Sequence, residues 1–144
     1  MSRKTDRRHA FNLAFQMLFR DEPPEELFGR YFNTGIYEEL GLSAKADKDF
    51  ILSSLNGIYR HSQHIDRKIS ELARGFTVNR LQKTDLAILR IAVYELLYSR
   101  DVPPKVAINE AVELSKLFSS HDSPAFVNGL LAQIVKLPDV KSEI

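Results

Sequence analysis

Four cationic side chains near the start of the chain are the residues best placed to do chemistry. Arg3 and Lys4 are followed four positions later by Arg7 and Arg8, and residues four apart lie on one face of a helix. Two adjacent rows of positive charge are unfavourable at a helix N-terminus, because the helix dipole is itself positive there. We therefore expect an anionic partner at this end of the chain, although a frayed, solvated helix end would also accommodate these charges.

The remaining charge is unevenly distributed along a chain of 144 residues whose net charge is only +1. Residues 21–50 contain eight acidic and three basic side chains, whereas residues 60–90 are again mainly basic. The near-neutral total excludes a histone-like polycation. The uneven distribution favours a localised anionic partner, and solvated helix faces are the alternative interpretation.

Catalytic and metal-binding motifs are absent from the sequence. The chain has no cysteine, which excludes a disulfide framework, a thiolate zinc site and a cysteine nucleophile. Neither a glycine-rich phosphate loop nor a GxSxG nucleophile motif occurs. His61 and His64 are three residues apart and could share a metal ion, but no carboxylate at helical spacing completes a ligand set. The sequence therefore predicts no catalytic residue, no metal and no cofactor.

The hydrophobic stretches are those of a soluble, cytoplasmic protein. The N-terminal residues are charged, and no stretch approaches the roughly 18 consecutive apolar residues of a membrane span. The longest apolar-rich stretch, residues 86–98, is interrupted by Arg90 and Glu95. Because buried charges need partners, we expect these two side chains to pair with groups on neighbouring helices.

Helical periodicity dominates the chain and predicts an all-α fold, a compact bundle of about seven helices. A long apolar pattern changes register near residues 61–64, which indicates a break between two helices. Residues 81–98 are apolar on all sides, as in a central buried helix around which two sub-bundles could meet. Prolines suit the first turn of a helix. The expected helices cover residues 5–19, 25–32, two stretches on either side of residues 61–64, 81–98, and two segments that begin at Pro104 and Pro124.

The last helix contains a glycine whose role is ambiguous. Asn128-Gly129 between apolar stretches is a typical hairpin signal, but its flanks fit a helix capped by Ser123. We favour a helix in which Gly129 allows another backbone to approach closely, so that Gly129→Leu would overpack. Residues 139–144 are expected to form a loose tail.

Several segments resemble the NusB family of transcription antitermination factors. They occur in the family's order and together run from about residue 3 to residue 135. The family's first helix is arginine-rich, and its closing motif is similar to FVNGLL here. The resemblance implies one NusB-like RNA-binding domain over residues 1–144. The segments that carry it are residues 7–10 and 16–19 of the first helix, 85–96 of the central helix, 102–116 of the next helix and 126–131 of the closing motif.

What this resemblance implies is a non-catalytic all-α protein with RNA and protein partners. NusB proteins bind the boxA element of nascent, single-stranded RNA together with NusE, a small-subunit ribosomal protein. The pair helps to assemble an antitermination complex on RNA polymerase, notably for ribosomal RNA transcription. The RNA-binding residues implied by position, together with the basic rows, are Arg3, Lys4, Arg7, Arg8, Gln16, Phe19, Asp85, Phe118, Asp122 and Phe126.

The chain departs from the family pattern in its first helix. The family often carries further arginines roughly where His9 and Phe11 stand, so RNA affinity could be lower or the sequence preference altered. Phe11, Phe15 and Phe19 share one helical stripe. We expect the first two rings to lie in the core, and Phe19 to stack on an unpaired base.

Three alternatives remain open at this stage. NusB-like domains also occur fused to ribosomal RNA cytosine methyltransferases, which would require a further cofactor-binding domain. The chain could instead act only as a protein partner in ribosome assembly, without an RNA sequence preference. An exposed apolar patch on so small a bundle could bind NusE or a second copy of the chain, so a homodimer is also possible.

Overall fold

Seven α-helices and two short 3-10 helices make up the part of the chain that the computed structural model describes, residues 2–73, 78–99 and 101–137. No strand occurs within these residues, and the predicted all-α fold is confirmed. The α-helices are α1 (Arg3–Met17), α2 (Pro24–Thr34), α3 (Lys48–Arg60), α4 (Ser62–Leu72), α5 (Lys83–Tyr98), α6 (Pro104–Phe118) and α7 (Ser123–Ile134), and the 3-10 helices are η1 (Ile36–Leu40) and η2 (Val78–Arg80).

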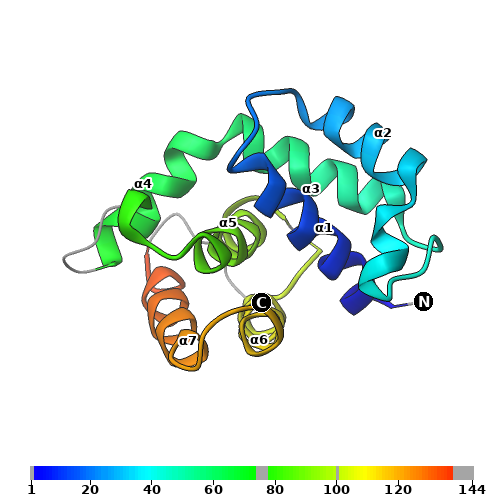
Figure 1. The fold of residues 1–144 in the computed structure, drawn as a ribbon. Coiled ribbons are helices and arrows are strands. Elements are labelled where there is room, and N and C mark those ends of the chain that lie inside the picture. Colours follow the sequence, from blue (N-terminus) through cyan, green and yellow to red (C-terminus); the bar gives the residue numbers. More distant parts are fainter. Residues whose placement is uncertain (1, 74–77, 100, 138–144) are drawn as a thin grey trace.

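Helix α5 occupies the centre of the fold, as its apolar pattern predicts. It packs against α1, α3, α4, α6 and α7, and Ile88, Leu89 and Leu96 are fully buried. Helices α1, α2 and α3 pack on one another on one side of α5, while α6 and α7 pack together on the other side (Figure 1). These contacts agree with two sub-bundles that meet around α5, since its apolar residues on all sides are covered by both.

Most helix boundaries follow local signals in the sequence. The predicted break falls at His61, between α3 and α4, and α6 begins at Pro104 as expected. Helix α1 begins two residues earlier than predicted, because the Ser2 hydroxyl caps it by accepting a hydrogen bond from the Thr5 backbone N–H at 3.2 Å. It ends at Met17, so Phe19 lies just beyond the helix. The predicted tail, residues 139–144, lies outside the described residues.

The start of α7 differs from the prediction in its capping residue. Asp122, not Ser123, occupies the N-cap position, and the Asp122 side chain makes no capping hydrogen bond. Ser123 is the first helical residue, and its buried hydroxyl lies 2.9 Å from the hydroxyls of Ser119 and Ser120. The expectation that Ser123 caps the helix is therefore wrong, because its side chain joins a hydroxyl network in the preceding loop.

The close approach that the sequence predicts at Gly129 occurs at a different glycine. Gly129 lies within α7, which confirms the helix over the hairpin. A Cβ atom built on Gly129 would meet no other atom within 4 Å, so the predicted close approach and the overpacking by Gly129→Leu are both wrong. The close approach occurs instead at Gly57 of α3, where a Cβ atom would lie 2.0 Å from Cε1 of Tyr94 on α5. Glycine at residue 57 is what allows α3 and α5 to pack at this distance.

Candidate nucleic-acid interface

One of the two basic rows on α1 is turned toward the protein. The guanidinium of Arg7 lies 3.1 Å from a carboxylate oxygen of Glu95 on α5, and the two side chains are only 5% and 2% exposed. Arg3 is half-exposed but also engaged, because it pairs with Asp6 and Asp47 at 3.2 and 3.1 Å. The expectation that Glu95 pairs with a neighbouring helix is confirmed.

This geometry argues against the predicted RNA contact of Arg7. A phosphate could reach the guanidinium only if Arg7 left Glu95, and breaking a buried ion pair is strongly unfavourable. The second interrupting charge of α5, Arg90, also pairs as expected. Its guanidinium donates two hydrogen bonds to the Asp66 carboxylate of α4, at 2.9 and 2.7 Å. Both pairs therefore hold helices together rather than offering charge to a ligand.

The second basic row lines a groove between α1 and α6. Lys4 is well exposed, with its amino group 3.7 Å from a carboxylate oxygen of Glu110, so the pair is loose and contributes little to stability. The groove contains both carboxylates and cations, and the Lys116 amino group lies 3.1 Å from a carboxylate oxygen of Glu113. The groove encloses about 140 Å³ and is lined by Lys4, Arg8, Glu110, Glu113, Leu114, Lys116 and Leu117.

Four phenylalanines form a chain of ring contacts that begins at the end of α6. The Phe118 ring stacks on Phe11 of α1, with centroids 4.7 Å apart and planes 16° from parallel. Phe11 also contacts Phe15, which meets the edge of Phe19 at 5.3 Å. Phe11 is buried in the core, as predicted, and Phe15 is half-buried. The end rings, Phe118 and Phe19, are 38% and 60% exposed, so both can contact a base.

A network of hydroxyl groups joins the start of α5 to the loop between α6 and α7. Asp85 is buried and accepts a hydrogen bond of 2.6 Å from the Ser119 hydroxyl. The Gln82 side-chain amide donates to the Ser120 hydroxyl at 3.1 Å. Sequence reasoning missed this network, although three serines within residues 119–123 were a signal for it. The hydroxyl groups that take part are those of Thr84, Ser119, Ser120 and Ser123.

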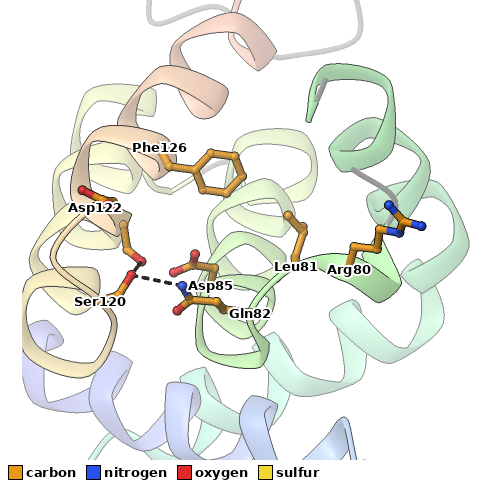
Figure 2. Close-up of a pocket in the computed structure, with 8 residues that line it drawn as sticks. Arg80, Leu81, Gln82, Asp85, Ser120, Asp122 and Phe126 are labelled. Carbon is orange, nitrogen blue, oxygen red and sulfur yellow. Dashed lines mark hydrogen bonds between the residues drawn. The ribbon is translucent and has the colours of Figure 1, made fainter. Parts of the chain in front are cut away.

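A pocket of about 260 Å³ lies beside this network and brings together three of the predicted RNA-binding residues, Asp85, Asp122 and Phe126. Figure 2 shows the half-buried Phe126 ring above Asp85 and Gln82, while the exposed Asp122 carboxylate points away from that ring. Arg80 is an exposed cation at the edge of the pocket that was not predicted. The other residues that line the pocket are Leu81, Ser120 and Ser123.

The groove, the ring contacts and the pocket are joined at the end of α6. Phe118 contacts α1 through Phe11, and the next residue, Ser119, contacts α5 through Asp85. The structure therefore brings Lys4, Phe19 and Phe118 to connected surfaces and adds Asp85 as a buried support. Gln16 lies half-buried on α1 between Phe15 and Phe19 in sequence. Arg3 and Arg7 are paired with carboxylates of the protein instead. Neither of them lines the groove or the pocket.

His9 is also explained by the structure as a core residue. Its ring is fully buried, with Nε2 3.0 Å from the Ser43 carbonyl and Nδ1 2.8 Å from the Tyr31 hydroxyl. Since a carbonyl can only accept, Nε2 carries the proton and Nδ1 accepts from Tyr31. Burial lowers the pKa of His9, mainly by disfavouring the charged imidazolium, and the Ser43 hydrogen bond and Asp6 only partly oppose this effect.

The other candidate chemistry of the sequence has a structural explanation. The His61 ring stacks on Tyr98, with centroids 3.9 Å apart. No group of three or more histidine or carboxylate side chains within the described residues could hold a metal ion. In the same part of the chain, no helix is both long and apolar enough to cross a membrane.

The fold and these surfaces define a small all-helical protein with one face that combines basic and aromatic side chains. The model of the NusB family matches residues 4–136, and the chain belongs to the NusB family. The transcription antitermination protein NusB of Clostridium novyi is 40% identical over 137 residues, covering 94% of this chain and 99% of that protein. The NusB of Acetivibrio thermocellus is 37% identical over 137 residues, covering 95% and 90% of the two chains.

Solved structures of the family have the same fold. NusB of T. maritima superposes with a TM-score of 0.80 at 34% identity, covering 96% of this chain and 94% of that chain. A crystal structure of antitermination factors NusB and NusE in complex with dsRNA gives a TM-score of 0.77 at 28% identity, covering 93% and 96%.

Proposed function

We propose that this chain is a non-catalytic transcription antitermination factor of the cytoplasm. It binds boxA-type nascent RNA together with NusE and helps to assemble an antitermination complex on RNA polymerase, notably for ribosomal RNA transcription. Family membership over residues 4–136 supports this function. So does the similarity to a NusB that was crystallised with NusE and dsRNA.

The observation that carries the proposal is the connected basic and aromatic face at the end of α6. Lys4 and Arg8 line a groove that includes Leu117, the residue before Phe118. Arg80 and Phe126 line a pocket that includes Ser120, two residues after Phe118. RNA outside a duplex exposes phosphates to cations and ring faces to aromatic side chains. A face with both kinds of group, arranged over four helices, matches this chemistry better than that of an enzyme active site.

The residues of this face have different roles in the proposal. Lys4, Arg8 and Arg80 supply positive charge for phosphates, while Phe19, Phe118 and Phe126 supply rings for bases. Asp85 is a buried support of this face, because its carboxylate accepts a hydrogen bond from Ser119 in the loop that follows Phe118. In this proposal, Gln16 forms a hydrogen bond with the RNA and Asp122 is a negatively charged neighbour of it. Arg3 is a weaker RNA contact than Lys4.

A binding experiment with four RNAs tests this function. Fluorescence anisotropy would compare a boxA-like single strand, its scrambled sequence, and duplexes of both, each with and without NusE. We expect tightest binding to the boxA-like strand in the presence of NusE. Equal affinity for the boxA-like and scrambled strands would contradict sequence-specific recognition and favour a protein partner in ribosome assembly instead.

Self-association stays a separate prediction. Leu117 of α6 is 54% exposed and borders the groove with Lys4 and Arg8. An apolar side chain in that place could contact NusE or a second copy of the chain. Sedimentation of the protein alone and with NusE would show which of the two binds.

A further inference from the structure

A second cavity, of about 540 Å³, lies where the start of α3 meets the end of α5 and the start of α1. It shares no lining residue with the groove or the pocket of the proposed RNA-binding face. Carboxylates, serine hydroxyls and aromatic rings line it. Its volume is typical of a site for a small molecule, so the cavity needs an explanation apart from RNA.

Small side chains on α3 open the space between α3 and α5. Ser54 and Gly57 are three residues apart and lie on one face of α3. Gly57 allows Tyr94 of α5 to lie against α3, because a Cβ atom at residue 57 would be 2.0 Å from Cε1 of Tyr94. Tyr94 and Ser54 both line the cavity. The face that α3 turns toward Tyr94 therefore offers a hydroxyl group and little bulk.

Ser54 is a buried polar side chain whose hydroxyl lacks a partner. Three serines are buried in the described part of the chain, Ser54, Ser115 and Ser123. Ser115 donates to the Val112 carbonyl at 2.7 Å, and Ser123 belongs to the hydroxyl network. Ser54 is 2% exposed and forms no side-chain hydrogen bond with any described residue. Because buried hydroxyls nearly always have a partner, Ser54 indicates a polar group bound in the cavity.

The charges around the cavity favour a positive ligand. Asp49 in the first turn of α3 and Asp101 beyond α5 are exposed, and neither has an ion pair within the described residues. Arg3 also lines the cavity, but Asp6 and Asp47 already hold its guanidinium. Two unpaired carboxylates from separate elements suit a ligand that carries more than one positive charge.

The rest of the wall favours an organic cation over a metal ion. The Tyr94 and Tyr98 rings stack with centroids 6.0 Å apart, and both line the cavity. Phe50 shows that a ring of this wall attracts a cation, since the Arg3 guanidinium carbon lies 4.0 Å from its centroid. The described residues contain no group of three histidine or carboxylate side chains that could hold a metal ion. Separated carboxylates and ring faces instead match ammonium groups joined by an aliphatic chain.

We propose that this cavity binds a small aliphatic polyamine. Its ammonium groups pair with Asp49 and Asp101, its chain lies along the rings of Tyr94 and Tyr98, and one N–H group donates to the Ser54 hydroxyl oxygen. The ligand thereby gives partners to both carboxylates and to the buried hydroxyl. The site is separate from the proposed RNA-binding face and does not depend on that function.

Isothermal titration of the full chain with spermidine, without RNA, tests this site. We expect saturation at one spermidine per chain and weaker binding as the salt concentration rises. Magnesium chloride at the same ionic strength is the reference and should leave most of the spermidine binding in place. Heat that does not saturate, or binding that magnesium chloride abolishes, would show a diffuse layer of counterions and overturn the site.

Substitutions of the lining residues locate the ligand. Asp49→Asn and Asp101→Asn should each weaken spermidine binding about threefold, as expected for the loss of one exposed ion pair. The double variant should weaken it about tenfold if the two effects add. Ser54→Ala should weaken binding about threefold through one lost hydrogen bond. Its unfolding midpoint in urea should not fall, because the hydroxyl has no partner within the described residues.

Glu38→Gln combined with Glu39→Gln is the matched control, since both carboxylates are exposed on η1 and neither lines the cavity. It should leave spermidine binding unchanged. An equal loss in this control and in the Asp49 and Asp101 double variant would overturn the site, because the binding would then follow net charge alone. Wild-type affinity of Ser54→Ala would overturn the part assigned to its hydroxyl.

A trilysine peptide with blocked ends separates a free polyamine from a lysine-bearing protein partner, because it carries the same charge as spermidine. We expect it to bind more weakly than spermidine. Tighter binding of the peptide would overturn the polyamine and assign the cavity to lysine side chains of a protein. No measurement in this series contains RNA or NusE, so its failure leaves the proposed function intact.

Discussion

The inner and outer faces of α1 both carry arginine, but the two faces place it in different surroundings. On the inner face, Arg7 pairs with Glu95 and His9 is hydrogen-bonded to Tyr31, and all of these side chains are buried. On the outer face, Lys4 and Arg8 line an open groove along α6. The rows Arg3–Arg7 and Lys4–Arg8 have identical spacing in the sequence, and they differ only by one residue of register.

This difference shows that a basic helix is not equivalent to a basic surface. A rotation of about 100° per residue separates the two rows on a helix. Contact with α5 decides that Arg7 is buried, and a buried cation needs an acidic partner such as Glu95. Arg3 is exposed but paired with Asp6 and Asp47, so we expect Lys4 and Arg8 to be the main contacts to RNA among the four.

Removal of Arg7 should have the largest effect of the changes that test this comparison. Arg7→Ala breaks the buried ion pair with Glu95, which should destabilise the fold by about 3–5 kcal/mol. Urea melts would measure the free energy of unfolding. Arg8→Ala is the matched control on the outer face and should stay within about 0.5 kcal/mol of wild type. Similar unfolding midpoints for the two variants would contradict the distinction between inner and outer rows.

The buried His9 should make stability depend on pH. Its pKa in the folded chain lies below the ordinary histidine value of about 6.5, because burial disfavours the imidazolium. The unfolded chain therefore binds more protons between these two pKa values, and stability should fall as the pH drops below about 6.5, by at most about 1.4 kcal/mol per pH unit.

Urea melts between pH 7.5 and pH 5 would measure this dependence. His9→Gln should flatten it, whereas His121→Gln, at an exposed position, should leave it unchanged. If His9→Gln retains the full slope, another group is responsible.

The outer row should control the salt dependence of RNA binding. Lys4→Ala combined with Arg8→Ala removes the two phosphate contacts that we propose for this row. The slope of log affinity against log salt concentration should fall by about 1.4, because each contact on a single strand accounts for about 0.7. A salt series in fluorescence anisotropy would measure it. Arg3→Ala should lower the slope by less than either single outer-face variant, because Asp6 and Asp47 already hold Arg3. An equal change would remove the distinction between the rows.

Asp122→Asn should have the smallest effect and the opposite direction. Asp122 is exposed at the pocket and makes no capping hydrogen bond, so the fold should change by only a few tenths of a kcal/mol. Loss of a negative charge near phosphates should strengthen RNA binding at low salt by about 0.5–1 kcal/mol, with a smaller gain as salt rises. The exposed Asp101→Asn is the control, and equal or weaker binding of Asp122→Asn at every salt concentration would exclude Asp122 as a neighbour of the RNA.

Local patterns in the sequence determined most of the fold. The apolar residues on all sides of residues 81–98 required a central helix, and Arg90 and Glu95 within it required partners on other helices. The break at His61 and the start at Pro104 follow from a register change and from proline's missing N–H group. The burial of Phe11 also follows from its position on the helical stripe. Each of these depends on neighbours within a few residues, so the sequence alone could reveal it.

Only the tertiary structure decided which polar and aromatic groups face one another. The Arg7–Glu95 pair joins residues 88 apart, the Asp85–Ser119 bond joins residues 34 apart, and the Phe11–Phe118 stack joins α1 to the end of α6. The same holds for Gly57, whose need for a small side chain comes from Tyr94 on another helix. A one-residue change in how α1 turns toward α5 would bring Arg8 into the buried place of Arg7. The packing of distant helices, rather than the local pattern of charge, therefore determines which side chains RNA can reach.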